Sequence, residues 1–124
     1  MPLLSSAITA LVAAEHYYIL WLEMFAWETK GPKVFRGAMP KEMFPKTTVM
    51  AANQGLYNGF LATGLVWSLC IPKDDDDWSR HVATYFLSCV VVAGAYGAKT
   101  AAKKIWWVQG MPALIGLVVL QVGL

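Results

Sequence analysis

Charged residues are scarce in this chain of 124 residues. Asp, Glu, Lys and Arg make up 15% of it, whereas about 25% is typical of a soluble domain. Hydrophobic residues account for 57%, and this balance excludes an ordinary soluble domain, a disordered chain, a coiled coil and a nucleic-acid-binding domain. The two cysteines, Cys70 and Cys89, form no CxxC motif, which excludes a thiol redox relay and a zinc site made by cysteines alone. The length predicts one domain.

The apolar residues lie in four blocks, over about residues 3–27, 48–71, 82–98 and 105–123. About 20 apolar residues of helix cross the hydrocarbon core of a bilayer. So short a chain has no room for a soluble shell around four buried helices. The sequence therefore predicts an all-α fold, an integral membrane antiparallel four-helix bundle whose short connections join neighbouring helices.

Basic residues are concentrated in the first and third connections, and acidic residues in the second. Lys and Arg number five in the first connection and three in the third, whereas the second holds the aspartates at 74–77. Basic loops stay on the cytoplasmic side, so both termini are expected outside. We interpret the aspartates as a solvated turn. The first connection contains three prolines, which exclude a long helix; it either covers an inner opening or packs at the membrane interface.

The first span carries ionisable residues at membrane depth. Glu15 and His16 lie near its middle, followed by Tyr17, and Glu23 lies deeper towards the cytoplasm. Such groups cost at least about 2.5–3.5 kcal/mol each at the centre of a membrane helix and often mark function. Helical spacing places His16, Glu23 and Trp27 on one face, whereas Glu15 is rotated about 100 degrees from His16.

The other three spans also carry polar side chains, and most of these fall in the inner half of the membrane. They are Asn53, Gln54, Tyr57 and Asn58 on the second span, Tyr96 on the third and Gln109 on the fourth. The outer half is almost entirely apolar. This asymmetry predicts a polar pocket that opens towards the cytoplasm. The alternative is that the amides form hydrogen bonds between helices and hold the bundle together.

Three segments carry a resemblance to a known family: EHYYILWLEMFAWET, NQGLYNGFLATGL and VVVAGAYGAKT. The chain resembles the small integral membrane proteins of the domain-of-unknown-function 1304 family, and the resemblance covers essentially all four spans. It implies a four-helix membrane protein and no established reaction. The residues that match the family pattern are Glu15, His16, Tyr17, Glu23, Trp27, Asn53, Gln54, Tyr57 and Asn58. The aspartates at 74–77 do not belong to that pattern.

The first functional hypothesis is an intramembrane enzyme that uses acid/base catalysis on a lipophilic small molecule. Burial in a medium of low dielectric constant favours the neutral form of a carboxylic acid, which can then donate a proton. Glu23 and His16 are the first candidates for proton transfer, and Glu15 is the next. The expected ligand-binding residues are Asn53, Gln54, Tyr57, Asn58, Trp27, Tyr96, Gln109 and Tyr17. The reactions that suit this set are isomerisation, cyclisation and epoxide opening.

No cofactor and no metal are expected. A haem held by two histidines needs both at matching depth, but His16 is at mid-membrane and His81 at the outer edge. A zinc site from Glu15, His16 and Glu23 is unfavourable because these side chains diverge around the helix. Catalysis by a Ser or Cys nucleophile has no supporting triad pattern.

Two other hypotheses remain open. One is a proton-coupled transporter of lipophilic compounds, which at this size would have to form a homodimer. The other is a structural or accessory membrane subunit. The expected partners are the lipid bilayer and a lipophilic ligand, with no nucleic acid. The expected location is the plasma membrane in a bacterium and an endomembrane such as the endoplasmic reticulum in a eukaryote.

Overall fold

The computed structural model describes residues 1–124 and is all-α, as the sequence predicts. Its five α-helices and three short helical turns contain no strand. The helices are α1 (Leu3–Phe25), α2 (Gly31–Val34), α3 (Thr48–Cys70), α4 (Asp76–Thr100) and α5 (Met111–Gln121). The turns are η1 (Lys41–Met43), η2 (Lys73–Asp75) and the π-helical η3 (Trp106–Gly110), which leads directly into α5.

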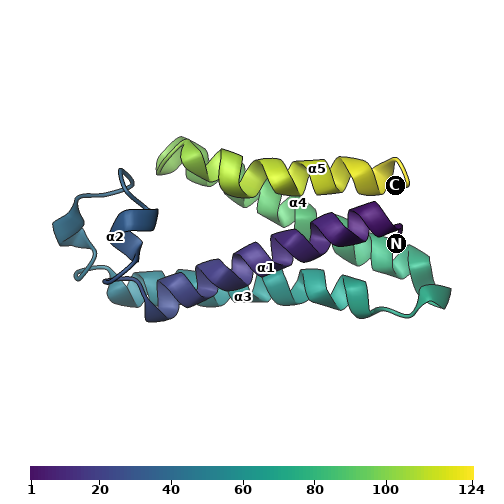
Figure 1. Ribbon diagram of the computed structural model, residues 1–124, viewed down its shortest axis with the longest axis horizontal. Coiled ribbons are helices and arrows are strands. Elements are labelled where there is room, and N and C mark those ends of the chain that lie inside the picture. The colour runs from purple at the N-terminus through teal and green to yellow at the C-terminus, as the bar shows by residue number, and fades with distance from the viewer.

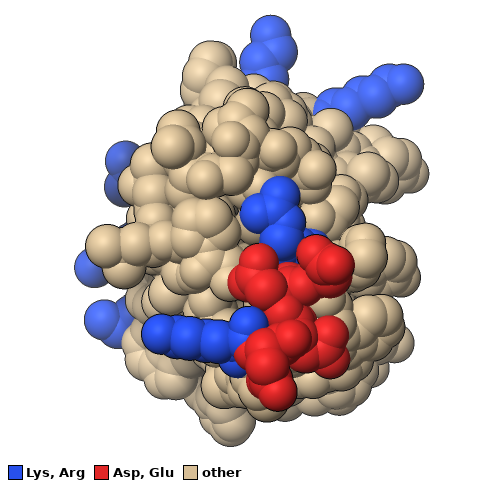
Figure 2. All heavy atoms as spheres, turned by 90° about the vertical axis from the view of Figure 1, so that its right-hand side faces the viewer, with Lys and Arg blue, Asp and Glu red and all other residues tan.

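The long helices run in alternating directions and pack side by side. α1 lies along α3, α3 packs on α4, and α5 packs on both α4 and α1 (Figure 1). Both termini and the connection from α3 to α4 lie at one end, which we call the acidic end because it carries the aspartates at 74–77 (Figure 1; Figure 2). The connection 26–47 and residues 101–105 lie at the other end, which we call the basic end (Figure 1).

Two helical segments are long and apolar enough to cross a membrane: α1 (Leu3–Phe25) and the segment Lys73–Thr100 that contains α4. The segment Trp106–Gln121 is apolar but shorter. α3 has the length, but its strongly polar Asn53, Gln54 and Asn58 lower its mean hydropathy. Two of the four predicted spans therefore meet the requirement for a membrane helix on length and composition.

The buried core joins all four long helices. It consists of eight side chains: Val12, Ala13, Leu65, Ala83, Leu87, Val90, Ala113 and Leu120. Towards the basic end, α4 and η3 approach until their backbones touch. A Cβ atom placed on Gly94 would lie 2.6 Å from the Cα atom of Gly110, far closer than such atoms approach in proteins. The absence of a side chain at Gly94 therefore allows η3 to lie directly against α4.

The acidic run differs from the expected solvated turn. Only the first part is a turn, η2 (Lys73–Asp75), and α4 already begins at Asp76, before the apolar segment that starts at 82. Asp76 and Asp77 lie in the first turn of α4. Carboxylates are stabilised there by the unpaired backbone N–H groups and the positive end of the helix dipole. The Met1 amino group also pairs with Asp76.

Candidate functional site

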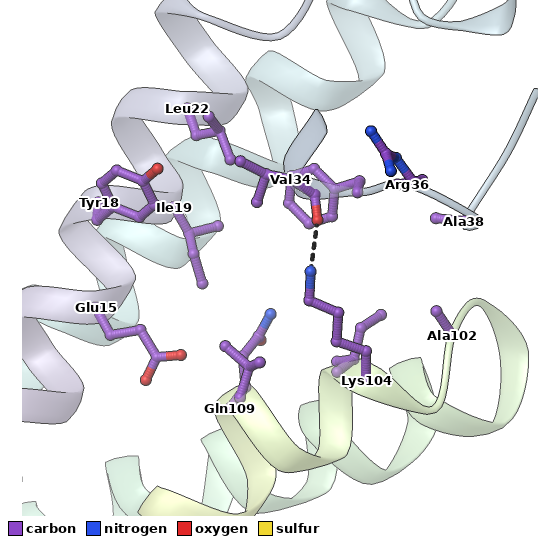
Figure 3. Close-up of a pocket in the computed structure, with 13 residues that line it drawn as sticks. Glu15, Tyr18, Ile19, Leu22, Val34, Arg36, Ala38, Ala102, Lys104 and Gln109 are labelled. Atoms are coloured by element: carbon purple, nitrogen blue, oxygen red, sulfur yellow. Dashed lines mark hydrogen bonds between the residues drawn. The ribbon is translucent and has the colours of Figure 1, made fainter. Parts of the chain in front are cut away.

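A cavity lies at the basic end between α1, the connection 26–47 and the segment 102–109 (Figure 3). Its volume is about 90 Å³, and the space between its atoms, including the part open to solvent, is about 580 Å³. Most of the wall is apolar. The polar or charged residues on the wall are Glu15, Tyr18, Arg36, Lys104 and Gln109. The cavity thus combines an apolar wall with few polar groups, as small-molecule sites usually do.

One face of α1 forms a wall of this cavity. Glu15, Ile19 and Leu22 recur at intervals of four and three residues, which places them on one face of a helix. The sequence placed the proton-transfer groups on the neighbouring face, with His16 and Glu23. That neighbouring face packs against α3 instead, and Leu20 lies directly over Gly59. The structure therefore brings Glu15, rather than Glu23 or His16, to the cavity.

Glu15 has an unpaired oxygen. Its Oε1 atom is buried and has no hydrogen-bond partner in the protein. The carboxyl group points towards the side chain of Gln109 across the cavity (Figure 3). Leaving a buried polar atom unpaired costs about 1–3 kcal/mol, so such atoms usually have a role. A ligand that reaches Glu15 can supply the missing partner.

Gln109 is carried by the irregular turn η3. The chain here forms π-helical hydrogen bonds over Trp106–Gly110 before α5 continues as an α-helix. Pro112 contributes to this irregularity, because it has no N–H group to donate to the carbonyl of Val108. The π-helical turns within helices are frequent at functional sites. Here the turn presents both Val108 and Gln109 to the cavity.

The connection 26–47 covers the basic end. Trp27 anchors it: its Nε1 atom donates to Thr47 Oγ1 at 3.0 Å, and its ring packs on Phe44 at 4.8 Å between centroids. Lys104 ties the connection to the other side of the cavity by donating from Nζ to the carbonyl oxygen of Val34 at 2.9 Å. Trp27 is thus a buried anchor beside the cavity and not part of its wall.

Sequence reasoning missed the residues that this connection and residues 102–105 add to the wall. They are Val34, Phe35, Arg36, Ala38, Ala102, Lys104 and Ile105. The signal available was the presence of large apolar residues, Val34 and Phe35 among them, in a charged and proline-rich loop. The loop forms one side of the cavity, and both interpretations given to it, a cover over an inner opening and packing at the membrane interface, stay predictions.

Glu23 and His16 are both engaged elsewhere. Glu23 Oε1 accepts a hydrogen bond from Asn58 Nδ2 at 2.7 Å, which joins α1 to α3. His16 is buried, and its Nδ1 atom lies 2.9 Å from the carbonyl oxygen of Val12, while Nε2 has no partner. The Glu23–Asn58 hydrogen bond joins two helices, as the alternative interpretation expects of amides that hold the bundle together.

The remaining predicted ligand-binding residues face away from the cavity. Asn53 Nδ2 donates to the carbonyl oxygen of Val49 on its own helix, and Tyr17 shares a hydrogen bond with Thr63 at 2.9 Å. Gln54 is exposed, and so are Tyr57 and Tyr96. The structure does not gather these side chains with Glu15 and Gln109. Their role in ligand binding stays a prediction.

No group of three or more His, Cys, Asp or Glu side chains is placed to hold a metal ion. Both cysteines are free, Cys70 exposed near the acidic end and Cys89 half-buried on α4. Neither lines the Glu15 cavity.

Fold and site together define an all-α protein with two helices suited to a membrane and an apolar cavity that carries a carboxyl group. The chain belongs to the family described as Protein of unknown function (DUF1304), whose model matches residues 10–121. The resemblance noted in three sequence segments is thereby confirmed. The chain is 32% identical to the uncharacterized protein YpaA of Lactococcus lactis subsp. lactis (strain IL1403) over 121 aligned residues. The aligned region covers 95% of the chain and 97% of that relative. No solved structure matches.

Proposed function

We propose that the chain is an integral membrane protein whose four long helical segments all cross the bilayer, with the basic end on the cytoplasmic side. The apolar α1 and Lys73–Thr100 support this arrangement. Seven of the ten Lys and Arg residues lie in the two connections of the basic end, and Lys99 lies in the adjoining last turn of α4. The distribution of basic residues in membrane proteins favours the cytoplasmic side for such an end. α3 fits the arrangement because Glu23 and Asn58 hydrogen-bond each other between the helices.

This orientation predicts which cysteines a membrane-impermeant maleimide can reach. Cys70, exposed at the acidic end, should be labelled from outside intact cells. A cysteine introduced by Gly37→Cys in a Cys70→Ala, Cys89→Ala background should be labelled only after the membrane is opened. The opposite labelling pattern would invert the orientation, and labelling of both sites in intact cells would contradict a membrane-spanning arrangement.

We further propose that the protein is an acid/base enzyme acting on a lipophilic small molecule. The observation that carries this proposal is the unpaired, buried oxygen of Glu15 on the wall of an otherwise apolar cavity. A carboxyl group in such surroundings can give a proton to a bound ligand or take one from it. The connection 26–47 would limit the access of water from the basic end.

Among the reactions considered, the geometry favours isomerisation. Glu15 is the one carboxyl group on the cavity wall. A single carboxyl group can remove a proton from one carbon of a ligand and return it to another, so that protons and charges balance without a second acid or base. Gln109, across the cavity, can donate its amide hydrogens to a carbonyl or hydroxyl oxygen of the ligand and so hold it in position.

The proposal is tested by incubating purified protein in deuterium oxide with a lipid extract of its host membrane, followed by mass spectrometry. A proton shift through Glu15 should place deuterium on carbon in a specific lipophilic compound, together with its isomer. The control is the same extract with heat-inactivated protein. A complete absence of deuterium incorporation and of any converted compound would contradict the enzyme proposal.

A proton-coupled transporter is less well supported. Alternating access would require the acidic end to open, yet contacts between helices hold that end together. Arg80 Nη2 donates to the carbonyl oxygen of Leu120 at 2.8 Å, joining α4 to α5. Ser79 Oγ donates to the carbonyl oxygen of Ser68 at 2.6 Å, joining α4 to α3. The Glu15 cavity lies at the basic end.

A further inference from the structure

Two cations line the Glu15 cavity at the end away from Glu15. Arg36 comes from the connection 26–47 and Lys104 from the segment before η3 (Figure 3). Neither cation has an acidic partner, because the single ion pair of the structure joins Met1 to Asp76. The ammonium group of Lys104 makes one hydrogen bond, to Val34, and so keeps two further hydrogens to donate.

Apolar side chains separate these cations from Glu15. Ile19 and Leu22 lie on the α1 side of the wall between the two ends, and Gln109 lies across from them (Figure 3). From Glu15 to Leu22 the wall follows seven residues of α1, which correspond to about 10 Å of helix. The cavity therefore has a carboxyl group at one end, apolar side chains of α1 along its middle, and at the other end two positive charges without an acidic partner.

We propose that the ligand of this cavity is an anionic amphiphile. Its carboxylate or phosphate binds Arg36 and Lys104, its hydrocarbon part packs along Ile19 and Leu22, and the reacting part reaches Glu15. This inference rests on the proposed function and names the class of its substrate. Arginine suits the anionic group because its planar guanidinium can donate two parallel hydrogen bonds to one carboxylate or phosphate.

Other cations at the basic end provide a matched comparison. Lys46 and Lys103 lie in the same two connections as Arg36 and Lys104, but neither lines the cavity. If the basic end only attracts anions through its overall positive charge, all four residues should contribute alike. If the cavity binds the anionic group directly, Arg36 and Lys104 should matter far more.

The test measures binding of radiolabelled dodecanoate and of the neutral dodecanol to protein in phosphatidylcholine nanodiscs, with empty nanodiscs as the baseline. The test variant is Arg36→Gln with Lys104→Gln, and the control variant is Lys46→Gln with Lys103→Gln, which has the same net charge. We expect the test variant to bind dodecanoate about 30-fold more weakly. Binding by the control variant, and binding of dodecanol by both, should change less than about twofold. Thermal melting verifies that both variants fold.

The outcomes separate this inference from the function on which it rests. Equal losses in test and control variants, or wild-type protein that binds both compounds with the same affinity, would overturn the anionic ligand but leave the cavity as a lipophile site. No binding of either compound by wild-type protein would overturn both. Phosphatidylglycerol added to the nanodiscs identifies the source of the anion. Dodecanoate binding that persists supports a free amphiphile, and competition that depends on Arg36 and Lys104 supports a bilayer phospholipid.

Discussion

Replacing Glu15 by Gln should reduce deuterium incorporation and conversion of the ligand by about a thousandfold, since general acid/base groups contribute about 10²–10⁴ to catalysed rates. The substitution keeps the size and hydrogen-bonding capacity of the side chain and removes only its ability to transfer a proton. Ligand binding should change little. The measurement is the rate of deuterium incorporation together with the affinity for dodecanoate.

Glu23→Gln is the matched control, because it makes the same chemical change two turns further along α1. Glu23 lies outside the cavity and bonds to Asn58, and a glutamine can still accept that hydrogen bond. We expect this variant to keep activity within about threefold of wild type, the range of a minor structural effect. Loss of activity in Glu23→Gln with activity retained in Glu15→Gln would contradict this account. It would support the prediction from sequence that Glu23 transfers the proton.

Gly94→Ala should destabilise the protein by about 3 kcal/mol, at the upper end of the range for overpacking. The added methyl group would lie 2.6 Å from the Cα and 2.7 Å from the N of Gly110, and backbone atoms cannot move aside as a side chain can. Relief requires η3 to shift, and Gln109 shifts with it. The variant should therefore also bind the cavity ligand more weakly.

Gly97→Ala provides the comparison on the same helix. A Cβ atom there would lie 3.0 Å from Cγ2 of Ile105, which is a side-chain methyl group and not a backbone atom. Alanine also favours a helix over glycine by about 1 kcal/mol. We expect less than about 1 kcal/mol of destabilisation, measured as denaturant unfolding in detergent micelles. Equal effects of the two substitutions would mean that α4 and η3 do not pack by backbone contact.

The sequence predicts the positions of the long helices well, because apolar blocks between clusters of charge leave few alternatives. It does not predict where α4 begins, since Asp76 and Asp77 are polar residues that the start of a helix can accommodate. The sequence also does not predict the π-helical turn η3. Pro112 signals an irregularity, but the sequence does not show that it takes the form of a π-helical turn over Trp106–Gly110.

Of the predicted site residues, the structure places Glu15 and Gln109 on the wall of the cavity at the basic end, and their roles stay a prediction. The choice of face on α1 is what the sequence leaves undetermined. Glu15 and His16 are adjacent and both polar, so periodicity supports either face. Packing decides between them, because the small Gly55 and Gly59 of α3 admit the side of α1 that carries Leu20 and Glu23. The side of α1 that carries Glu15 then faces the connection 26–47 and η3, which form the rest of the cavity wall.

Whether Glu15 faces an apolar cavity open to lipophilic compounds is tested most directly by labelling with dicyclohexylcarbodiimide, a lipophilic reagent that modifies carboxylic acids in apolar surroundings. Peptide mass spectrometry of the membrane-bound protein reports each modified residue. We predict that Glu15 reacts at least about tenfold faster than Glu23, a difference of about 1.4 kcal/mol in activation free energy, and that dodecanoate slows its reaction. Equal modification of both glutamates, or a Glu15 that stays unmodified while Glu23 reacts, would contradict the account.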